Sequence, residues 1–119
     1  MSRIPADFLP GTLECLVLKT LATGPLHGYA IAQHIGQVSL DQLKVEQGSL
    51  YPALDRLERN GRVTSVWRPT PTGRSARYYT ITALGRKQLG VKVSEYERVA
   101  AAIARVPACT GAASAATTT

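Results

Sequence analysis

Apolar residues recur at every third or fourth position in three segments of the first half of the chain, which is the spacing of one buried helix face. This pattern predicts three helices, over about 12–23, 28–38 and 48–60. Gly24-Pro25 ends the first of them. Asn60-Gly61 ends the third, because both residues tolerate a left-handed backbone.

The period changes after the third helix, where residues typical of strands replace the helical pattern. Two such runs, 62–68 and 77–81, are separated by a loop over 69–73 that is rich in proline, threonine and glycine. They predict an antiparallel hairpin with a mobile, basic tip at Arg74 and Arg77.

A long last helix is expected after the hairpin, over about 83–105, with Thr82 as its N-cap. The resulting fold is mainly α with a two-stranded β-wing, which is the layout of a winged helix-turn-helix. In that layout the third helix can enter a DNA major groove while the hairpin tip reaches the neighbouring backbone. We expect a DNA-binding domain, a C-terminal dimerisation helix and a disordered tail of small residues, over 1–82, 83–106 and 107–119.

The composition is that of one small domain, with 119 residues, 12.7 kDa and 45% hydrophobic residues. No apolar leader opens the chain, and no apolar run approaches the roughly 18 residues that span a bilayer. Cys15 and Cys109 make no zinc spacing, and neither a phosphate-binding glycine loop nor clustered carboxylates occur. We expect a cytoplasmic protein that is not an enzyme and that needs no metal or cofactor. Cys15 and Trp67 are expected to serve packing.

The chain is basic, with a net charge of +6 and a pI of about 9.8, which favours nucleic acid or an anionic membrane surface as partner. Between Arg56 and Lys92 only Glu58 opposes the basic residues, so that this block carries +8. Nine of the 14 basic residues lie there: Arg56, Arg59, Arg62, Arg68, Arg74, Arg77, Arg86, Lys87 and Lys92. The block runs from the third helix through the wing into the last helix, and the sequence shows no basic amphipathic face of the kind that binds membranes. This placement favours DNA as the partner. The alternative is an arginine-rich solvated surface.

The third helix has an exposed face that suits a DNA groove. With its leucine stripe turned inward, the opposite face holds small, hydroxyl and guanidinium side chains: Gly48, Ser49, Pro52, Arg56 and Arg59. Arginine can bind a guanine edge or a phosphate, and Ser49 near the helix N-terminus can donate to a phosphate. The alternative is a solvated face with an Arg59–Asp55 ion pair. Tyr51 either packs on the second helix with its hydroxyl toward a phosphate, or only packs.

Three runs of the chain resemble, in the right order, the signature motifs of PadR-like transcriptional regulators. They are Gly24-Pro25-Leu26-His27-Gly28-Tyr29-Ala30-Ile31, then Gly48-Ser49-Leu50-Tyr51-Pro52-Ala53-Leu54 with Arg56-Leu57-Glu58 and Gly61, then Gly73-Arg74, Arg77-Tyr78-Tyr79, Ile81-Thr82 and Gly85-Arg86. The resemblance covers residues 11–106, and the length is similar to the short subfamily with a single C-terminal helix. Pro69 and Pro71 in the wing loop depart from the polar or acidic residues of many relatives.

The resemblance implies a homodimeric repressor that binds a pseudo-palindromic operator in double-stranded DNA and responds to a small aromatic or drug-like effector. The family's DNA-contacting positions map here onto Ser49, Tyr51, Pro52, Arg74 and Arg77. Tyr29 resembles a contact to the DNA backbone, and Lys44, which precedes the third helix, is expected to touch a phosphate. The exposed helix face adds Arg56 and Arg59 to these expected DNA-binding residues. The alternative is a winged-helix ligand-sensing or protein-interaction module without specific DNA binding, against which the intact Ser49, Arg74 and Arg77 argue.

The last helix carries an apolar stripe with spacings of 4, 3, 4 and 3, formed by Leu89, Val93, Tyr96, Ala100 and Ile103. A helix of about 23 residues spans roughly 34 Å, which is longer than a body of this size needs, so we expect two copies to pair along it. Phe8 and Leu9 are expected to add cover at this dimer interface. Tyr96 stands where some drug-binding relatives carry an interface aromatic. It therefore either contacts a ligand or simply fills the interface, and the second interpretation is favoured.

Overall fold

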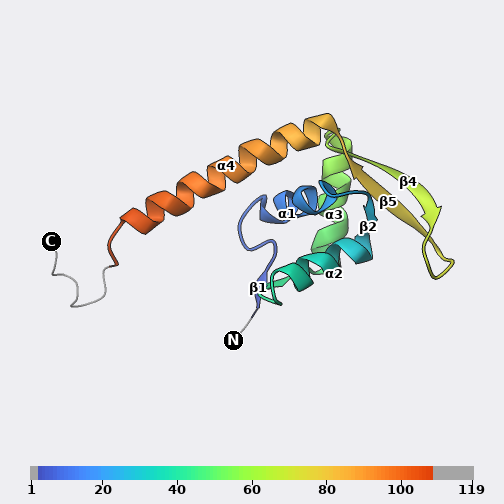
Figure 1. Cartoon of the computed structure of the whole chain (residues 1–119), viewed down its shortest axis with the longest axis horizontal. Helices are drawn as coiled ribbons and strands as arrows, with labels where there is room; N and C mark the ends of the chain where they lie inside the picture. Colours follow the sequence, from blue (N-terminus) through green and yellow to red (C-terminus); the bar gives the residue numbers. More distant parts are fainter. Residues whose placement is uncertain (1–2, 109–119) are drawn as a thin grey trace.

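The computed structural model describes residues 3–108, which form four helices and two small sheets (Figure 1). The helices are α1 (Thr12–Leu21), α2 (Gly28–Val38), α3 (Gln47–Arg59) and α4 (Ala83–Arg105). The strands are β1 (Ile4–Pro5), β2 (Leu26–His27), β3 (Leu43–Lys44), β4 (Val63–Pro69) and β5 (Ser75–Ile81). The first three helices form a body from which the β4–β5 wing and α4 extend in different directions. The predicted fold class, a winged helix, is confirmed.

The three helices of the body bury the faces that the apolar spacing predicted. The stripe of α3 is fully buried and consists of Leu50, Leu54 and Leu57. It packs in one core cluster with Val17 of α1 and Ile31 of α2. Burial of each such side chain stabilises the fold by about 2 kcal/mol. The wing contributes to this core only near its base, through Val63, Tyr79 and Ile81.

Short strands that the sequence pattern did not predict tie the body together. β2 pairs antiparallel with β5 through Leu26↔Tyr79 and His27↔Tyr78, so that the wing belongs to a three-stranded sheet of order β2-β5-β4. β1 pairs in parallel with β3, which holds the N-terminal segment beside the start of α3. The segment before α1 thus contains a strand of two residues.

The hairpin is longer than predicted. Pro69 still pairs with Ser75, so that only 70–74 connect the strands, whereas the two predicted runs leave 69–76 between them. Arg77 consequently lies inside β5, opposite Trp67, and not at the wing tip. The expectation of a tip with two arginines is wrong for Arg77 and correct for Arg74, which is exposed in the loop.

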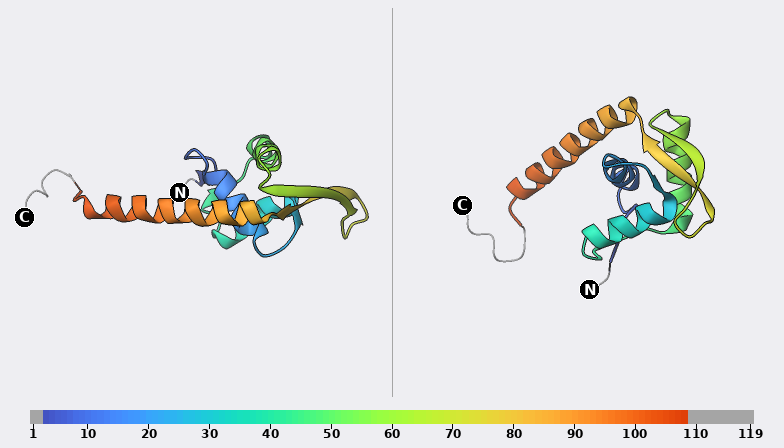
Figure 2. Two further views of the ribbon diagram at one scale, coloured as in Figure 1. Left: turned by 90° about the horizontal axis from the view of Figure 1, so that it is seen from above. Right: turned by 45° about the vertical axis from the view of Figure 1, so that its right-hand side comes forward.

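α4 begins where the base of the wing meets the end of α3. The Thr82 hydroxyl accepts a hydrogen bond from the Gly85 N–H at 3.0 Å, which confirms Thr82 as the N-cap, and it donates to the Gly61 carbonyl at 2.7 Å. Gly85 is buried, and a Cβ at this position would overlap the Arg62 carbonyl oxygen. Beyond this junction α4 runs past α1 and then leaves the body, as two further views show (Figure 2).

The described residues contain no helix that is long and apolar enough to span a membrane. They also contain no group of three or more histidine, cysteine, aspartate or glutamate side chains arranged to hold a metal ion. Of the expected tail over 107–119, residues 109–119 lie outside the described residues, and so does Cys109.

Candidate nucleic-acid interface

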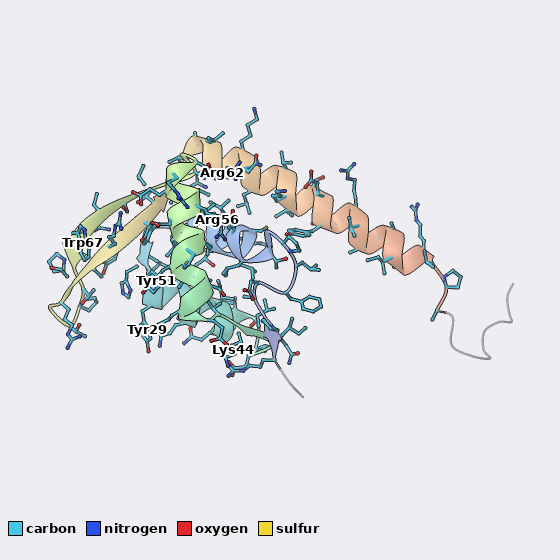
Figure 3. All side chains as sticks on the ribbon, turned by 180° about the vertical axis from the view of Figure 1, so that it is seen from behind. Tyr29, Lys44, Tyr51, Arg56, Arg62 and Trp67 are labelled. Atoms are coloured by element: carbon cyan, nitrogen blue, oxygen red, sulfur yellow. The ribbon has the colours of Figure 1, made fainter. Side chains whose placement is uncertain are left out.

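The outer face of α3 presents the side chains that helical geometry assigned to it. Gly48, Tyr51, Pro52, Asp55, Arg56 and Arg59 are exposed, and Ser49 is half-buried at the first turn. α3 lies along one side of the body with the wing next to it (Figure 3). Because residues of both elements line two hollows between them, we call this side the concave face. Arg59 makes no ion pair among residues 3–108, and the alternative Arg59–Asp55 pair is absent from this part of the chain.

Two of the predicted DNA-binding side chains are held by carboxylates from the N-terminal part of the chain. The Ser49 hydroxyl donates to Asp7 at 2.9 Å, and the Arg56 Nε donates to Glu14 of α1 at 2.7 Å. These four residues line one side of a hollow of about 320 Å³ between the N-terminal segment and α3. Sequence reasoning missed both carboxylates, because each is 42 residues from its partner. They fix the rotamers of Ser49 and Arg56 and compete with a phosphate for the same donors.

Glu58 connects α3 to the wing. One carboxylate oxygen accepts a hydrogen bond from Arg77 Nη2 at 3.1 Å, and the other accepts from the Ser65 hydroxyl at 2.8 Å. The pair is half-buried, with the Arg77 side chain 41% and the Glu58 side chain 31% exposed. Glu58 thereby sets the angle between α3 and the wing. It also neutralises part of the charge that the sequence assigns to Arg77.

Arg74 and Lys44 lie at opposite ends of the concave face. Arg74 is exposed in the wing loop, and its carbonyl accepts a hydrogen bond from the Thr70 N–H, which closes the loop. Within the described residues no carboxylate pairs with Arg74. Lys44 is exposed in β3 just before α3, and its ammonium group lies 3.3 Å from Glu46. The free cation at the wing tip is thus Arg74, whereas Lys44 has a solvent-exposed partner.

Tyr51 and Tyr29 stand side by side where α2 begins. The ring of Tyr51 lies over Gly28, so closely that a Cβ on Gly28 would be 2.8 Å from Tyr51 Cε1. This confirms that the ring packs on the start of the second helix, while 46% of the residue stays exposed. Tyr29 is 58% exposed. His27 caps α2 by accepting a hydrogen bond from the Ala30 N–H at 3.3 Å.

Trp67 is 68% exposed, and the expectation that it serves packing is wrong for the part of the chain that the structure describes. The reason is the length of the wing. β4 continues well beyond Val63, the one residue of this strand in the core, so that the second half of β4 has no body to pack against. Strand propensity places Trp67 on a strand but does not indicate where the core ends.

Burial raises the pKa of two acidic groups near the body. It raises the pKa of the Cys15 thiol, although Lys19 and Lys92 oppose the shift. Cys15 therefore stays protonated at neutral pH, which agrees with a core cysteine and not with a nucleophile. Burial likewise raises the pKa of Tyr79 against the opposing charge of Arg77, so that the hydroxyl remains neutral in the wing.

The stripe of α4 divides into two halves. Leu89, Val93 and Tyr96 are half-buried next to α1, whereas Ala100 and Ile103 are exposed farther out. The Tyr96 hydroxyl donates to the Pro10 carbonyl at 3.3 Å and lies 3.3 Å from the Thr12 hydroxyl. Phe8 and Leu9 are exposed nearby, at 69% and 50%. A hollow of about 310 Å³ between α1 and α4 is lined by Leu9, Thr12, Cys15, Leu16, Lys19, Val93, Tyr96 and Glu97.

A helix presented beside an arginine-bearing two-stranded wing defines the class of winged helix-turn-helix regulators. Within that class the family is clear, because residues 17–91 match the transcriptional regulator PadR-like family. The chain belongs to this family, whose members are transcriptional regulators and not enzymes.

Known proteins and structures resemble the chain over most of its length. A solved transcriptional regulator from Clostridium thermocellum superimposes with a TM-score of 0.77 at 27% identity, covering 86% of this chain and 99% of that one. An uncharacterised protein of Lysinibacillus sphaericus is 26% identical over 96 residues, which are 81% of this chain and 88% of that protein. A 37.1 kDa transposon protein of Streptomyces fradiae is 46% identical over 76 residues, which are 64% of this chain but only 20% of that protein.

Proposed function

We propose that this PadR-like regulator is a cytoplasmic, dimeric, sequence-specific DNA-binding repressor that releases its operator when a small aromatic or drug-like effector binds. The observation that carries the proposal is the concave face between α3 and the wing. It presents an exposed helix beside Arg59 and Arg74, the two arginines of this face without a carboxylate partner among the described residues. Duplex DNA has the matching shape and charge, because an exposed helix fits its major groove and cations neutralise its phosphates.

The roles of the side chains follow from their places on this face. Residues on the outer side of α3 read the groove, namely Ser49, Tyr51, Pro52, Arg56 and Arg59. Residues at the edge of this face bind the DNA backbone, namely Tyr29, Lys44, Arg74 and Arg77. Arg56 acts in addition as a positioning residue through Glu14, and Arg77 does so through Glu58.

Dimerisation is supported by the apolar surface of the outer half of α4. Val99 and Ile103 are 56% and 67% exposed on a helix that projects beyond the body (Figure 2), and Phe8 is 69% exposed in the segment before α1. A two-fold pairing along α4, the dimerisation helix over 83–106, covers these side chains. Such a dimer presents two α3 helices to a palindromic site, for which a separation of about 34–36 Å matches one turn of DNA.

The effector site is proposed at the hollow between α1 and α4. Its volume of about 310 Å³ suits a small ligand, and Val93, Leu16 and the ring of Tyr96 offer apolar contact. The Tyr96 hydroxyl holds the start of α1 through Pro10 and Thr12. A ligand that displaces this contact changes the angle between α1 and α4, and hence the spacing of the two α3 helices in the dimer.

The test is duplex binding followed by fluorescence anisotropy of a labelled promoter fragment, from the gene that encodes the protein or from its neighbours, against a scrambled fragment. We expect preference for the promoter and a slope of log K against log salt near −0.9 for each phosphate contact. Arg74→Ala weakens binding to every duplex, whereas Ser49→Ala changes the sequence preference. Arg105→Ala at the far end of α4 is the control for the loss of one charge. Equal binding to promoter and scrambled fragments at moderate salt contradicts a specific operator.

A second candidate is a ligand-sensing or protein-interaction module without specific DNA binding. One observation favours it: Ser49 and Arg56 already have partners in Asp7 and Glu14. A dimer that binds a hydrophobic dye but shifts no duplex at low salt supports this second function and excludes the first.

A further inference from the structure

Trp67 occupies an unusual place on the wing, because a large apolar side chain is left 68% exposed on the face that the wing turns toward α3. Side chains alternate between the two faces of a strand pair. Ser65, Trp67, Arg77 and Tyr79 therefore share one face, since Trp67 is opposite Arg77 and Ser65 is opposite Tyr79. Ser65 and Arg77 bind Glu58, which identifies this face as the one toward α3.

The outer face of the same strands is different. It carries Val66, Arg68 and Tyr78, and the Arg68 guanidinium stacks on the Tyr78 ring with 4.6 Å to the centroid. The His27 ring meets Tyr78 edge-on at 5.2 Å. The aromatic ring on the outer face is thus engaged within the protein, whereas Trp67 on the inner face is largely open to solvent.

Trp67 forms one wall of a hollow of about 380 Å³ between the start of α2, α3 and the wing. We call this the aromatic hollow; its lining includes Tyr29, Tyr51, Trp67, Arg77 and Tyr79. Figure 3 labels three of these side chains: Tyr29 at the start of α2, Tyr51 on α3 and Trp67 on the wing. A second hollow, of about 370 Å³, adjoins it along α3 and shares Tyr51, Arg77 and Tyr79 with it. Because they share these three side chains, the two hollows lie next to each other beside the exposed face of α3, and we call them together the groove.

The chemistry of this groove matches a sugar–phosphate backbone. The aromatic side chains offer flat apolar surfaces to the C–H edges of deoxyribose. The second hollow is lined by Arg59, whose guanidinium can bind a phosphate, and also by the carboxylate of Asp55. A duplex keeps its bases stacked inside, so that the surface available to a side chain beside the major groove is sugar and phosphate. A free anion would make no favourable contact with the aromatic side chains, and a purely apolar ligand would offer no negative charge to Arg59.

We propose that Trp67 is a direct DNA contact, whose indole packs on a deoxyribose of the strand that passes between α3 and the wing. The proposal rests on the proposed function and names a contact that no sequence motif indicated. Tyr51 packs on the opposite side of the same backbone strand. Trp67 adds affinity without adding charge, and it holds the wing at a fixed height on the DNA.

The sequence provides a direct probe, because Trp67 is the only tryptophan of the chain. Its fluorescence is measured with the full-length protein while duplex is added, and acrylamide reports its accessibility. We expect the duplex to change the Trp67 emission and to reduce acrylamide quenching at least twofold. A fluorescent label on the DNA follows binding independently by anisotropy.

Substitutions then separate the contact from the stability of the wing. Trp67→Ala should weaken duplex binding about tenfold, as expected for an aromatic side chain against nucleic acid, and leave the salt slope unchanged because no charge is lost. Trp67→Phe should restore most of the affinity. Val66→Ala is the matched control, since Val66 is 55% exposed on the outer face of the same strand, and it should bind as the unsubstituted protein does.

The outcomes distinguish the contact from the function on which it rests. If the labelled duplex binds but Trp67 stays as accessible to acrylamide as before, and Trp67→Ala binds normally, the contact is refuted while the DNA-binding function stands. If no duplex binds, the proposed function fails first. If Trp67 becomes protected from acrylamide when only the protein concentration rises, the groove binds a second copy of the chain. If only a flat aromatic compound protects Trp67 from acrylamide, the groove binds a small ligand. Either result overturns the proposed DNA contact.

Discussion

Gly85 occupies the point at which α4 meets the end of α3 and the start of β4. Its position admits no side chain: a Cβ would overlap the Arg62 carbonyl oxygen and would lie 2.8 Å from the Ile81 side chain. The Arg62 carbonyl cannot move freely, because it accepts a hydrogen bond from the Thr82 N–H at 3.0 Å. Gly85→Ala must therefore shift the first turn of α4.

The sign of this effect is opposite to that of an ordinary glycine in a helix. Replacing glycine by alanine inside a helix normally stabilises it by about 0.5–1 kcal/mol. At Gly85 the overlap with fixed backbone adds an overpacking cost of about 1–3 kcal/mol or more. We therefore expect Gly85→Ala to lower the free energy of unfolding by about 2 kcal/mol.

Gly90 provides the matched control on the same helix. A Cβ at Gly90 meets nothing within 4 Å, so Gly90→Ala should raise the free energy of unfolding by about 0.5–1 kcal/mol. The assay is urea unfolding followed by far-UV circular dichroism at one fixed protein concentration, because the proposed dimerisation would make stability depend on concentration. The two variants should differ by about 3 kcal/mol, or about 10 °C in Tm. Equal stability of the two variants would refute the close approach of α4 to Arg62.

Three further substitutions test single contacts. Asp7→Asn removes the negative charge beside Ser49 and should strengthen duplex binding about threefold in anisotropy titrations, whereas weaker binding would show that Asp7 positions Ser49. Gly28→Ala should displace the flexible end of Tyr51 and therefore weaken duplex binding, as Tyr51→Ala should. The free energy of unfolding should change by no more than about 0.5 kcal/mol. Unaltered duplex binding would contradict the packing of Tyr51 on Gly28. In a variant without the second cysteine, Cys15 should react with a thiol reagent at pH 8 much faster in urea than in the folded protein, because burial raises its pKa; equal rates contradict its burial.

Helical spacing predicted the main elements because it reports a property of each segment alone. The leucine stripe of α3 needed only the 3.6-residue period to be assigned to the interior, and Thr82 needed only its place before an apolar run. Strands β1, β2 and β3 have two residues each, which is too short for any period. Their partners lie far along the chain, so that Leu26 pairs with Tyr79 for reasons of packing that no local pattern contains.

The exposed face of α3 was likewise predictable from helical geometry, but the partners of its side chains were not. Arg56 was placed on the face correctly, whereas its contact with Glu14 depends on how α1 crosses α3. The second strand begins two residues earlier than the predicted run, at Ser75, so that Arg77 lies within the strand and not at the wing tip. The sequence predicts that Trp67 packs in the interior because it is apolar and lies on a strand. The strand extends beyond the core, however, so that Trp67 is exposed.

These contacts change the meaning of the +8 block. Counting charges along the chain sets only Glu58 against nine basic residues, but Glu14, outside the block, pairs with Arg56. When DNA binds, each of these carboxylates has two alternatives. It can stay paired with its arginine, which then positions the site without binding phosphate, or it can lose the arginine and remain unpaired beside the DNA backbone. The second case costs about the same free energy at every sequence, and a cost that all sequences share cancels in the difference between two of them. In the proposed function these carboxylates therefore lower the affinity for all DNA, and the sequence preference rests on the base contacts alone.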